Sequence, residues 1–296
     1  MTVSRFLDGF TVQKAALPGI TINYASAGSG PPVLLLHGHP QTHIVWRGIA
    51  PQLVAAGYQV IAPDLRGYGD SDKPASDAAH LTYSKRVMAQ DQIALMASLG
   101  HDRFAVVGHD RGGRVAHRLA LDFPDAVARL AVLDIAPTLT MYDRTDQEFA
   151  TRYFWWFFLI QPDGLPEKMI GSDPEYFLRR HIAGQVKVEG AVSEEAIAEY
   201  LRTYRDPATI HAICEDYRAS ASIDLEHDRA EPDRRVTAPL LAIWGEKSVV
   251  GALYDVEATW QEKAEQVTGC ALPCGHAIPE EAPDDLTRHL LSFLKG

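Results

Sequence analysis

Short, continuously apolar runs that alternate with amphipathic stretches constrain the fold of this chain more than any other feature. Strands of this kind are buried on both faces of a parallel sheet. Between them lie helical patterns such as residues 84–100 and 113–123. The alternation predicts an α/β fold with a mostly parallel, doubly wound sheet and helices on both faces. The runs are YQVIAPD (58–64), FAVVGH (104–109), RLAVLD (129–134), LLAIWG (240–245) and CALP (270–273).

Two segments depart from this alternation. Near the N-terminus, TINYASAG (21–28) and PVLLLHG (32–38) are separated by a Gly-Pro turn, which predicts a β-hairpin. After Pro137 the clean strand patterns stop until Pro239, and helical patterns and aromatic residues take their place. The simplest interpretation is a helical insertion over the carboxyl ends of the strands, where open α/β folds bind ligands. We therefore expect a core domain of residues 1–137 and 237–296 and a helical cap of residues 138–236.

Charge and composition exclude several classes of partner. The formal net charge is -11, whereas nucleic acid and anionic membranes attract basic surfaces, so we expect neither as a partner. No apolar run approaches the roughly 20 residues of a membrane-spanning helix. The three cysteines are too few for a disulfide framework and indicate free thiols in a reducing cytoplasm. An anionic small substrate would need a local basic site, because the average field of the protein repels it.

Residues 108–112, GHDRG, have the pattern of a nucleophile elbow, a strand-to-helix turn that presents a reactive side chain. Its central residue is Asp110, so a carboxylate stands where hydrolases usually carry serine; the alternative is that Asp110 only caps the helix. Two further loops follow predicted strands: HGHP (37–40) and DLRGYGDSDKP (64–74). A last loop, CGHAIPEEAP (274–283), contains His276. Loops that follow parallel strands meet at one edge of a sheet, so we expect these four to form one site.

Over essentially its full length the sequence resembles the α/β-hydrolase family, and within it the branch that uses an aspartate nucleophile. It is most similar there to the fluoroacetate (haloacetate) dehalogenases, through GHDRGGRVAHRLALDFP, LAVLDIAPT, FFLIQP, CEDYRA and GHAIPEEAP. The resemblance implies hydrolytic dehalogenation of short 2-haloacids, in which haloacetate and water give glycolate and halide. It also implies that no metal and no organic cofactor take part, and that the protein is a homodimer.

The chemistry of dehalogenation explains a carboxylate nucleophile. Asp110 can displace halide from the α-carbon and form an ester, which water then hydrolyses. A serine would form an ether, which water does not readily cleave. We expect His276 to act as the base for the water, and the resemblance assigns Asp134 the role of orienting it. Glu246, which follows a later strand, is the alternative acid.

Arg111 and Arg114 lie near the nucleophile and three residues apart, hence on one face of the helix that it opens. Cations are unfavourable at a helix N-terminus, so their presence there calls for another role. Arginine forms bidentate pairs with carboxylates, and we expect both to bind the substrate carboxylate and to keep Asp110 ionised. The plain alternative is that they pair with surface acids. The backbone amides of His39 and Arg111 are expected to stabilise the oxyanion of the hydrolytic step.

The resemblance also implies a halide pocket formed by Trp155, Trp156 and Tyr217, whose indole and phenol groups donate hydrogen bonds. Such aromatic residues could equally be core residues of the cap. At the position of Trp155 the fluoroacetate dehalogenases carry a histidine. An indole has one N–H donor and cannot become cationic, so we expect chloro- and bromoacetate activity with weakened defluorination.

Two other functions stay open. Epoxide hydrolases share the HG-x-P loop and the aspartate nucleophile, but they commonly have tryptophan directly after the nucleophile, where this chain has Arg111. A non-catalytic ligand-binding homologue is the second alternative, and the complete set of Asp110, His276 and Asp134 argues against it. Likewise His37, His39 and His43 resemble a metal cluster only in spacing, because no carboxylate or cysteine ligand stands nearby in the sequence.

Overall fold

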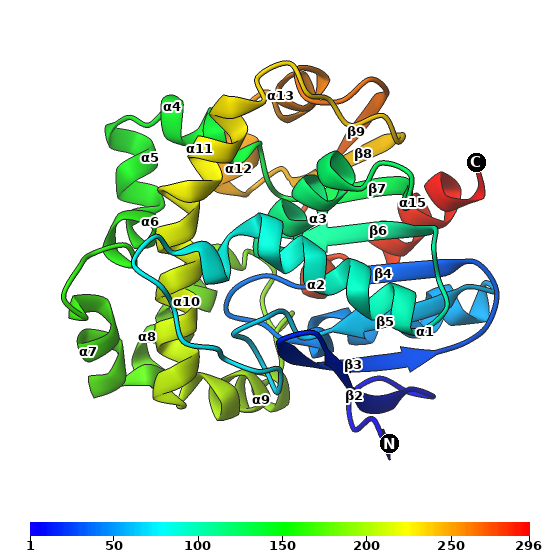
Figure 1. The fold of residues 1–296 in the computed structure, drawn as a ribbon, viewed down its shortest axis with the longest axis horizontal. Helices are drawn as coiled ribbons and strands as arrows, with labels where there is room; N and C mark the ends of the chain where they lie inside the picture. The colour runs from blue at the N-terminus through cyan, green and yellow to red at the C-terminus, as the bar shows by residue number, and fades with distance from the viewer.

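A nine-stranded sheet forms the centre of the computed structural model, which describes residues 1–296 (Figure 1). The strand order is β1-β2-β3-β5-β4-β6-β7-β8-β9. From β5 to β9 all neighbours are parallel, whereas β1, β2 and β3 pair antiparallel. The predicted α/β fold with a mostly parallel sheet is confirmed. The strands are β1 (Thr2–Val3), β2 (Thr11–Leu17), β3 (Ile20–Ala27), β4 (Pro32–Leu36), β5 (Gln59–Pro63), β6 (Phe104–His109), β7 (Val127–Leu133), β8 (Leu240–Gly245) and β9 (Val267–Leu272).

The predicted hairpin between residues 21–28 and 32–38 is wrong. β3 and β4 are not neighbours, because β5 lies between them. Tyr24 of β3 lies opposite Pro63 of β5, and Val33 of β4 lies opposite Val60 on the other side of β5. The reason is burial: β4 is buried almost throughout, and a continuously apolar strand is stable only at the centre of a sheet with a partner on each side.

Helices cover both faces of the sheet. α2 and α3 pack on each other, and α3 also packs against β6 and β7, while α1 and α15 contact each other elsewhere (Figure 1). Ser84 begins α2 by accepting a hydrogen bond from the amide of Val87, which satisfies one of the free N–H groups of the first turn. The helices outside the insertion are η1 (His43–Gly48), α1 (Ala50–Ala55), η2 (Leu81–Tyr83), α2 (Lys85–Ser98), α3 (Arg111–Asp122), α12 (Val249–Leu253), α13 (Val256–Gln261), α14 (Ile278–Glu281) and α15 (Pro283–Lys295).

Eight helices lie between β7 and β8 in the chain, and we call this segment, residues 138–236, the cap. In Figure 1 it is drawn in green to yellow and stands to the left of the sheet, and α10 packs against α7. Asp173, Ser193 and Asp206 cap the first turns of three of these helices. The cap helices are α4 (Thr138–Asp143), α5 (Gln147–Arg152), α6 (Phe154–Phe158), α7 (Leu165–Ser172), α8 (Pro174–Gln185), α9 (Glu194–Tyr204), α10 (Pro207–Ser220) and α11 (Ile223–Ala230).

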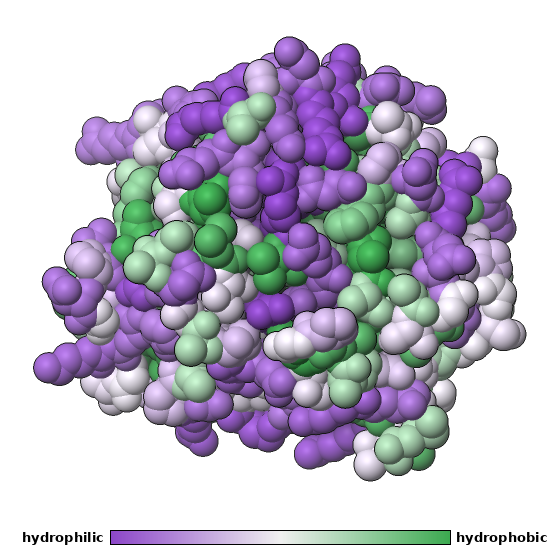
Figure 2. All heavy atoms as spheres, in the orientation of Figure 1, coloured by the Kyte–Doolittle hydropathy of each residue, from purple (hydrophilic) through white to green (hydrophobic).

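The cap and the sheet share one hydrophobic core. A single cluster of buried side chains includes Leu34 and Val107 from the sheet and Trp156 and Ile213 from the cap. Outside this core, the face drawn in Figure 2 carries mostly hydrophilic residues, with hydrophobic residues in small separate groups. None of the helices combines the length and the apolar character needed to cross a bilayer.

Candidate active site

Asp110 lies in a sharp turn between β6 and α3. Its backbone has φ 47° and ψ -115°, a conformation that residues other than glycine rarely adopt. The turn is possible because Gly112 packs against β4: a Cβ atom there would lie 2.3 Å from the carbonyl oxygen of Leu36. Although Asp110 occupies the N-cap position, its side chain makes no capping hydrogen bond. Its buried carboxylate is therefore not committed to the helix, contrary to the helix-cap alternative.

His276 and Asp134 are directly hydrogen-bonded. The imidazole Nδ1 lies 2.6 Å from Asp134 Oδ2, and both residues are buried. The amide of Gly245, at the end of β8, donates to the second carboxylate oxygen of Asp134 over 2.9 Å. The alternative acid, Glu246, is exposed on the surface. Of the two acids that the sequence offered, only Asp134 contacts the imidazole.

The charges around Asp110 favour an ionised carboxylate at this residue and a basic imidazole at His276. Burial would raise the pKa of Asp110, but the positive charges of His276 and Arg111 hold it well below its usual value. Burial would lower the pKa of His276, but the hydrogen bond and charge of Asp134, followed by the charge of Asp110, raise it above its usual value. The ring of His109, which precedes Asp110, lies 4.8 Å from that of His276. The charges of Asp110, His276 and Asp134 thus influence one another's protonation.

The loop after β4 approaches Asp110 with its backbone. The amide of His39 donates to Asp110 Oδ2 over 2.9 Å. A Cβ atom on Gly38 would lie 2.5 Å from that of Asp110, so only glycine permits this approach. The second predicted amide belongs to Arg111, the first residue of α3, whose N–H has no acceptor within the helix. The amide of His39 therefore lies directly against the Asp110 carboxyl group, and the amide of Arg111 follows Asp110 in the chain.

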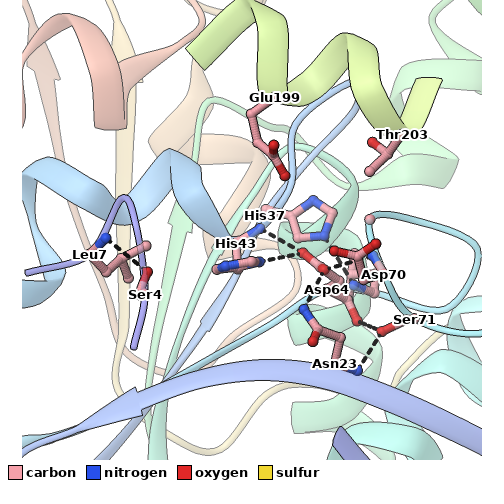
Figure 3. Close-up of polar contacts among 12 residues, drawn as sticks. Ser4, Leu7, Asn23, His37, His43, Asp64, Asp70, Ser71, Glu199 and Thr203 are labelled. Atoms are coloured by element: carbon pink, nitrogen blue, oxygen red, sulfur yellow. Dashed lines mark hydrogen bonds and ion pairs between the residues drawn. The ribbon is translucent and has the colours of Figure 1, made fainter. Parts of the chain in front are cut away.

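Asp64 holds the loops after β4 and β5 together (Figure 3). One oxygen accepts from the amide and the Nδ1 of His43 over 2.9 and 2.8 Å. The other accepts from Asn23 Nδ2 over 2.9 Å and from the amide of Asp70 over 3.0 Å. The histidines of the HGHPQTH loop therefore have separate partners: His43 pairs with Asp64, and His37 accepts from the amide of the residue after Asp64 over 3.0 Å. This network gives the loop after β4 a fixed path.

Arg114 is buried near Asp110 without an acidic partner. Its Nη1 donates to the carbonyl of Ala136 over 3.2 Å and to Thr138 Oγ1 over 2.9 Å. Its Nε is buried and has no hydrogen-bond partner. Arg111 is also buried, and it pairs with Asp216, a buried cap residue rather than a surface acid. Its Nη1 likewise has no partner. Each arginine thus keeps an uncommitted N–H for a ligand.

Two of the three predicted halide-binding residues pack directly against these arginines. The guanidinium carbon of Arg111 lies 4.1 Å from the centre of the Tyr217 ring, and that of Arg114 lies 4.7 Å from the Trp156 ring. The centres of the Tyr217 and Trp156 rings are 6.4 Å apart. Burial and the nearby charge of Asp110 raise the pKa of Tyr217 well above its usual value, so its hydroxyl stays a donor.

Trp155 lies on a different side of α6 from Trp156. Its ring contacts His181 of α8, with centres 4.8 Å apart, and the ring of His181 lies 4.5 Å from that of His39. Trp155 and His181 also line a cavity of about 760 Å³ between α5, α6, α7 and α8. Trp155 therefore lies between this outer cavity and the residues around Asp110. His181 was not identified from the sequence, because a lone histidine in a helix carries no signal of its position.

The chain matches the family model described as alpha/beta hydrolase fold over residues 31–283. It is 43% identical to a fluoroacetate dehalogenase from Burkholderia sp. over 97% of this chain and 94% of the relative. It is 38% identical to a soluble epoxide hydrolase from Corynebacterium sp. (strain C12) over 96% of each. A solved structure described as a candidate acyltransferase from Salmonella enterica matches with a TM-score of 0.98 and 59% identity, covering 99% of this chain and 98% of that one.

This chain therefore belongs to the α/β-hydrolase fold family, as its sequence predicted. Within that family its similarity extends to a relative that bears the name of a dehalogenase and to one that bears the name of an epoxide hydrolase.

Proposed function

We propose that this protein is a hydrolytic dehalogenase of short 2-haloacids, in which residues 138–236 form a cap domain over a core of residues 1–137 and 237–296. The observation that carries the proposal is the pair of buried arginines beside Asp110, each with an uncommitted N–H. A buried cation without a bound anion is costly, and a carboxylate beside Asp110 would satisfy both donors. The 43% identity to a fluoroacetate dehalogenase supports the same substrate class.

In the first step, an oxygen of Asp110 attacks the α-carbon of haloacetate. A C–O bond forms, the carbon–halogen bond breaks, and the halide leaves with the bonding electrons. Arg111 and Arg114 hold the substrate carboxylate, while Trp156 and Tyr217 donate hydrogen bonds to the leaving halide. The product of this step is an ester between Asp110 and a glycolate unit.

In the second step, His276 takes a proton from water, and the hydroxide attacks the carboxyl carbon of Asp110. The amides of His39 and Arg111 stabilise the oxyanion, which collapses as the bond to the glycolate oxygen breaks. That oxygen takes the proton held by His276, and the Asp110 carboxyl group loses its own proton to solvent, so the carboxylate is restored. Ester formation removes the negative charge of Asp110, one of the charges that raise the pKa of His276. The imidazole thus becomes easier to deprotonate at the stage where a neutral base is needed.

Epoxide hydrolysis is the second candidate function, because a soluble epoxide hydrolase is 38% identical over nearly the whole chain. Tyr217 and Tyr153 are both buried near Asp110, and their raised pKa values keep both hydroxyls protonated, so both could donate a hydrogen bond to an epoxide oxygen. A neutral epoxide, however, brings no anion to Arg114, which has no acidic partner, or to the free N–H of Arg111. We therefore place the haloacid first.

A single assay distinguishes these functions. Halide release is measured from fluoro-, chloro- and bromoacetate, and diol formation is measured in parallel from styrene oxide. Halide release with little diol supports the dehalogenase. Diol formation without halide release would establish the epoxide hydrolase instead, and neither product would favour a non-catalytic homologue.

Replacing Arg114 by lysine tests the substrate carboxylate. Lysine keeps the charge but loses the planar set of N–H donors, so kcat/KM for chloroacetate should fall about tenfold or more. Turnover of styrene oxide, if present, should change little. Arg118→Lys is the matched control, because Arg118 lies one turn further along α3 and pairs with Asp122 and Glu231 away from the site. Equal losses on charged and neutral substrates would assign Arg114 a structural role.

Replacing Trp155 by histidine tests halogen preference. Fluoride is small and basic, and its departure depends on strong hydrogen bonds, which an imidazole can supply as a cation. The ratio of kcat/KM for fluoroacetate over chloroacetate should rise by about tenfold, the value of one charged hydrogen bond. Phe154→His, one position earlier and half exposed, serves as the control. If the wild type already prefers fluoroacetate and Trp155→His does not raise the ratio, the expected role of Trp155 is contradicted.

A further inference from the structure

Asp216 of α10 lies at the centre of a buried charge network behind the proposed carboxylate site. It accepts from Arg111 Nε over 2.9 Å and from Arg111 Nη2 over 2.8 Å, one oxygen for each nitrogen. Tyr68 donates its hydroxyl to the same carboxylate over 2.7 Å, and Lys85 pairs with it from α2. Lys85 and Asp224 are 3.5 Å apart. All five residues are buried.

The geometry of this pair decides which part of Arg111 is free. Asp216 occupies the Nε and Nη2 edge of the guanidinium, and Nη2 donates further to the carbonyl of Asp216 and to Ser220. The one nitrogen without a partner is Nη1. A guanidinium held along one edge cannot rotate, so its remaining donors point in a single direction. Preorganised donors bind an anion without a further loss of side-chain freedom.

Lys85 completes the charge balance of this network. It pairs with both Asp216 and Asp224, so the two cations, Lys85 and Arg111, match the two carboxylates, Asp216 and Asp224. The network therefore fixes the position of Arg111 without leaving a buried ion unpaired.

We infer that Asp216, with Lys85 behind it, is a positioning residue that fixes the free face of Arg111 for the substrate carboxylate; this inference rests on the proposed function. In α10, Asp216 directly precedes Tyr217, and the ring of Tyr217 lies against the guanidinium of Arg111. The same contact therefore sets the distance between the group that binds the carboxylate and the group that donates to the halide. Asp216 thus connects α10 of the cap to α3 through Arg111 and to α2 through Lys85.

The test compares two charge-neutral double variants. Asp216→Asn with Lys85→Gln removes one charge of each sign, so that the net charge of the buried network is unchanged. Asp91→Asn with Arg66→Gln is the matched control, because Arg66 and Asp91 form a bidentate buried pair, at 2.7 Å for each contact, that does not involve Arg111 or Arg114. Tyr68→Phe removes a single hydrogen bond from Asp216 and keeps every charge.

The measurements are acetate binding by titration calorimetry and kcat and KM for chloroacetate. In the Asp216 double variant, the acetate Kd and the chloroacetate KM should each rise about tenfold or more, with a smaller change in kcat. Tyr68→Phe should shift both constants in the same direction by less. The Arg66 control should lose stability but leave both constants near their wild-type values.

The outcomes separate the inference from the proposed function. If the wild type binds acetate and the Asp216 variant does not, the inference stands even where no haloacetate is turned over, and only the dehalogenase proposal fails. Unchanged acetate Kd and KM in a folded Asp216 variant would overturn the inference. Should that variant not fold, Tyr68→Phe decides: a raised KM with unchanged kcat supports the positioning role, and an unchanged KM contradicts it.

Discussion

Replacing Asp110 by asparagine should reduce halide release from chloroacetate by about 10⁴-fold or more, the scale of losing a catalytic nucleophile. An amide has nearly the same shape and can still accept the hydrogen bond from the amide of His39, but it cannot displace halide. Because the side chain of Asp110 does not cap α3, circular dichroism and the thermal midpoint should show a folded protein.

Deamidation restores aspartate slowly, so activity must be measured on fresh protein and followed over time. Asp125→Asn, an exposed aspartate after the same helix, should behave as wild type. Full activity at the earliest time point in a folded Asp110→Asn protein would refute the aspartate nucleophile.

The second large effect is expected for His276→Asn. Without a base for the hydrolytic water, the ester on Asp110 should accumulate, and steady turnover should stop after about one equivalent of halide. Mass spectrometry of the peptide that contains Asp110 should then show an added carboxymethyl group. The charge of His276 also lowers the pKa of Asp110, but Arg111 and Arg114 stay in place to keep that carboxylate ionised.

His101→Asn, in the loop before β6, is the control and should neither trap an ester nor lose activity. Loss of activity with no adduct would mean that His276 is needed before the ester forms, or that the nucleophile is not Asp110. In the wild type, ester hydrolysis should slow as the pH falls below the pKa of His276, because the protonated imidazole cannot accept a proton from water. Rapid-quench measurement of the adduct against pH would show it.

The fold could be predicted where burial and periodicity agree. The apolar runs that form β5 to β8 are continuous, and their helices alternate with them, so the parallel sheet followed directly. β2 was missed because its sequence, TVQKAAL, is half-exposed and polar at several positions. The pairing of β3 was wrong because strand order depends on contacts across the sheet, which a neighbouring turn does not reveal.

The site was predictable in its motifs but not in its support. Asp110, His276 and Asp134 each follow a strand, and strand ends converge, so their proximity could be expected. Asp216 could not be found in this way, because it lies 105 residues from Arg111 in the chain and sits in an ordinary helical pattern. Only the folded structure, in which α10 comes within reach of the Arg111 side chain, makes it a partner. The position of Trp155 depends in the same way on the direction of a short helix.

The elbow separates shape from reactivity. Glycine at 112 and the backbone of β4 determine the turn, while the carboxylate at 110 contributes nothing to holding α3. The fold of the turn therefore does not depend on which side chain stands at position 110. An exchange of that one side chain can change the bond that is cleaved without requiring a different backbone. Reaction diversity in such a scaffold is limited by the surrounding charges, which must suit the new leaving group, rather than by the architecture itself.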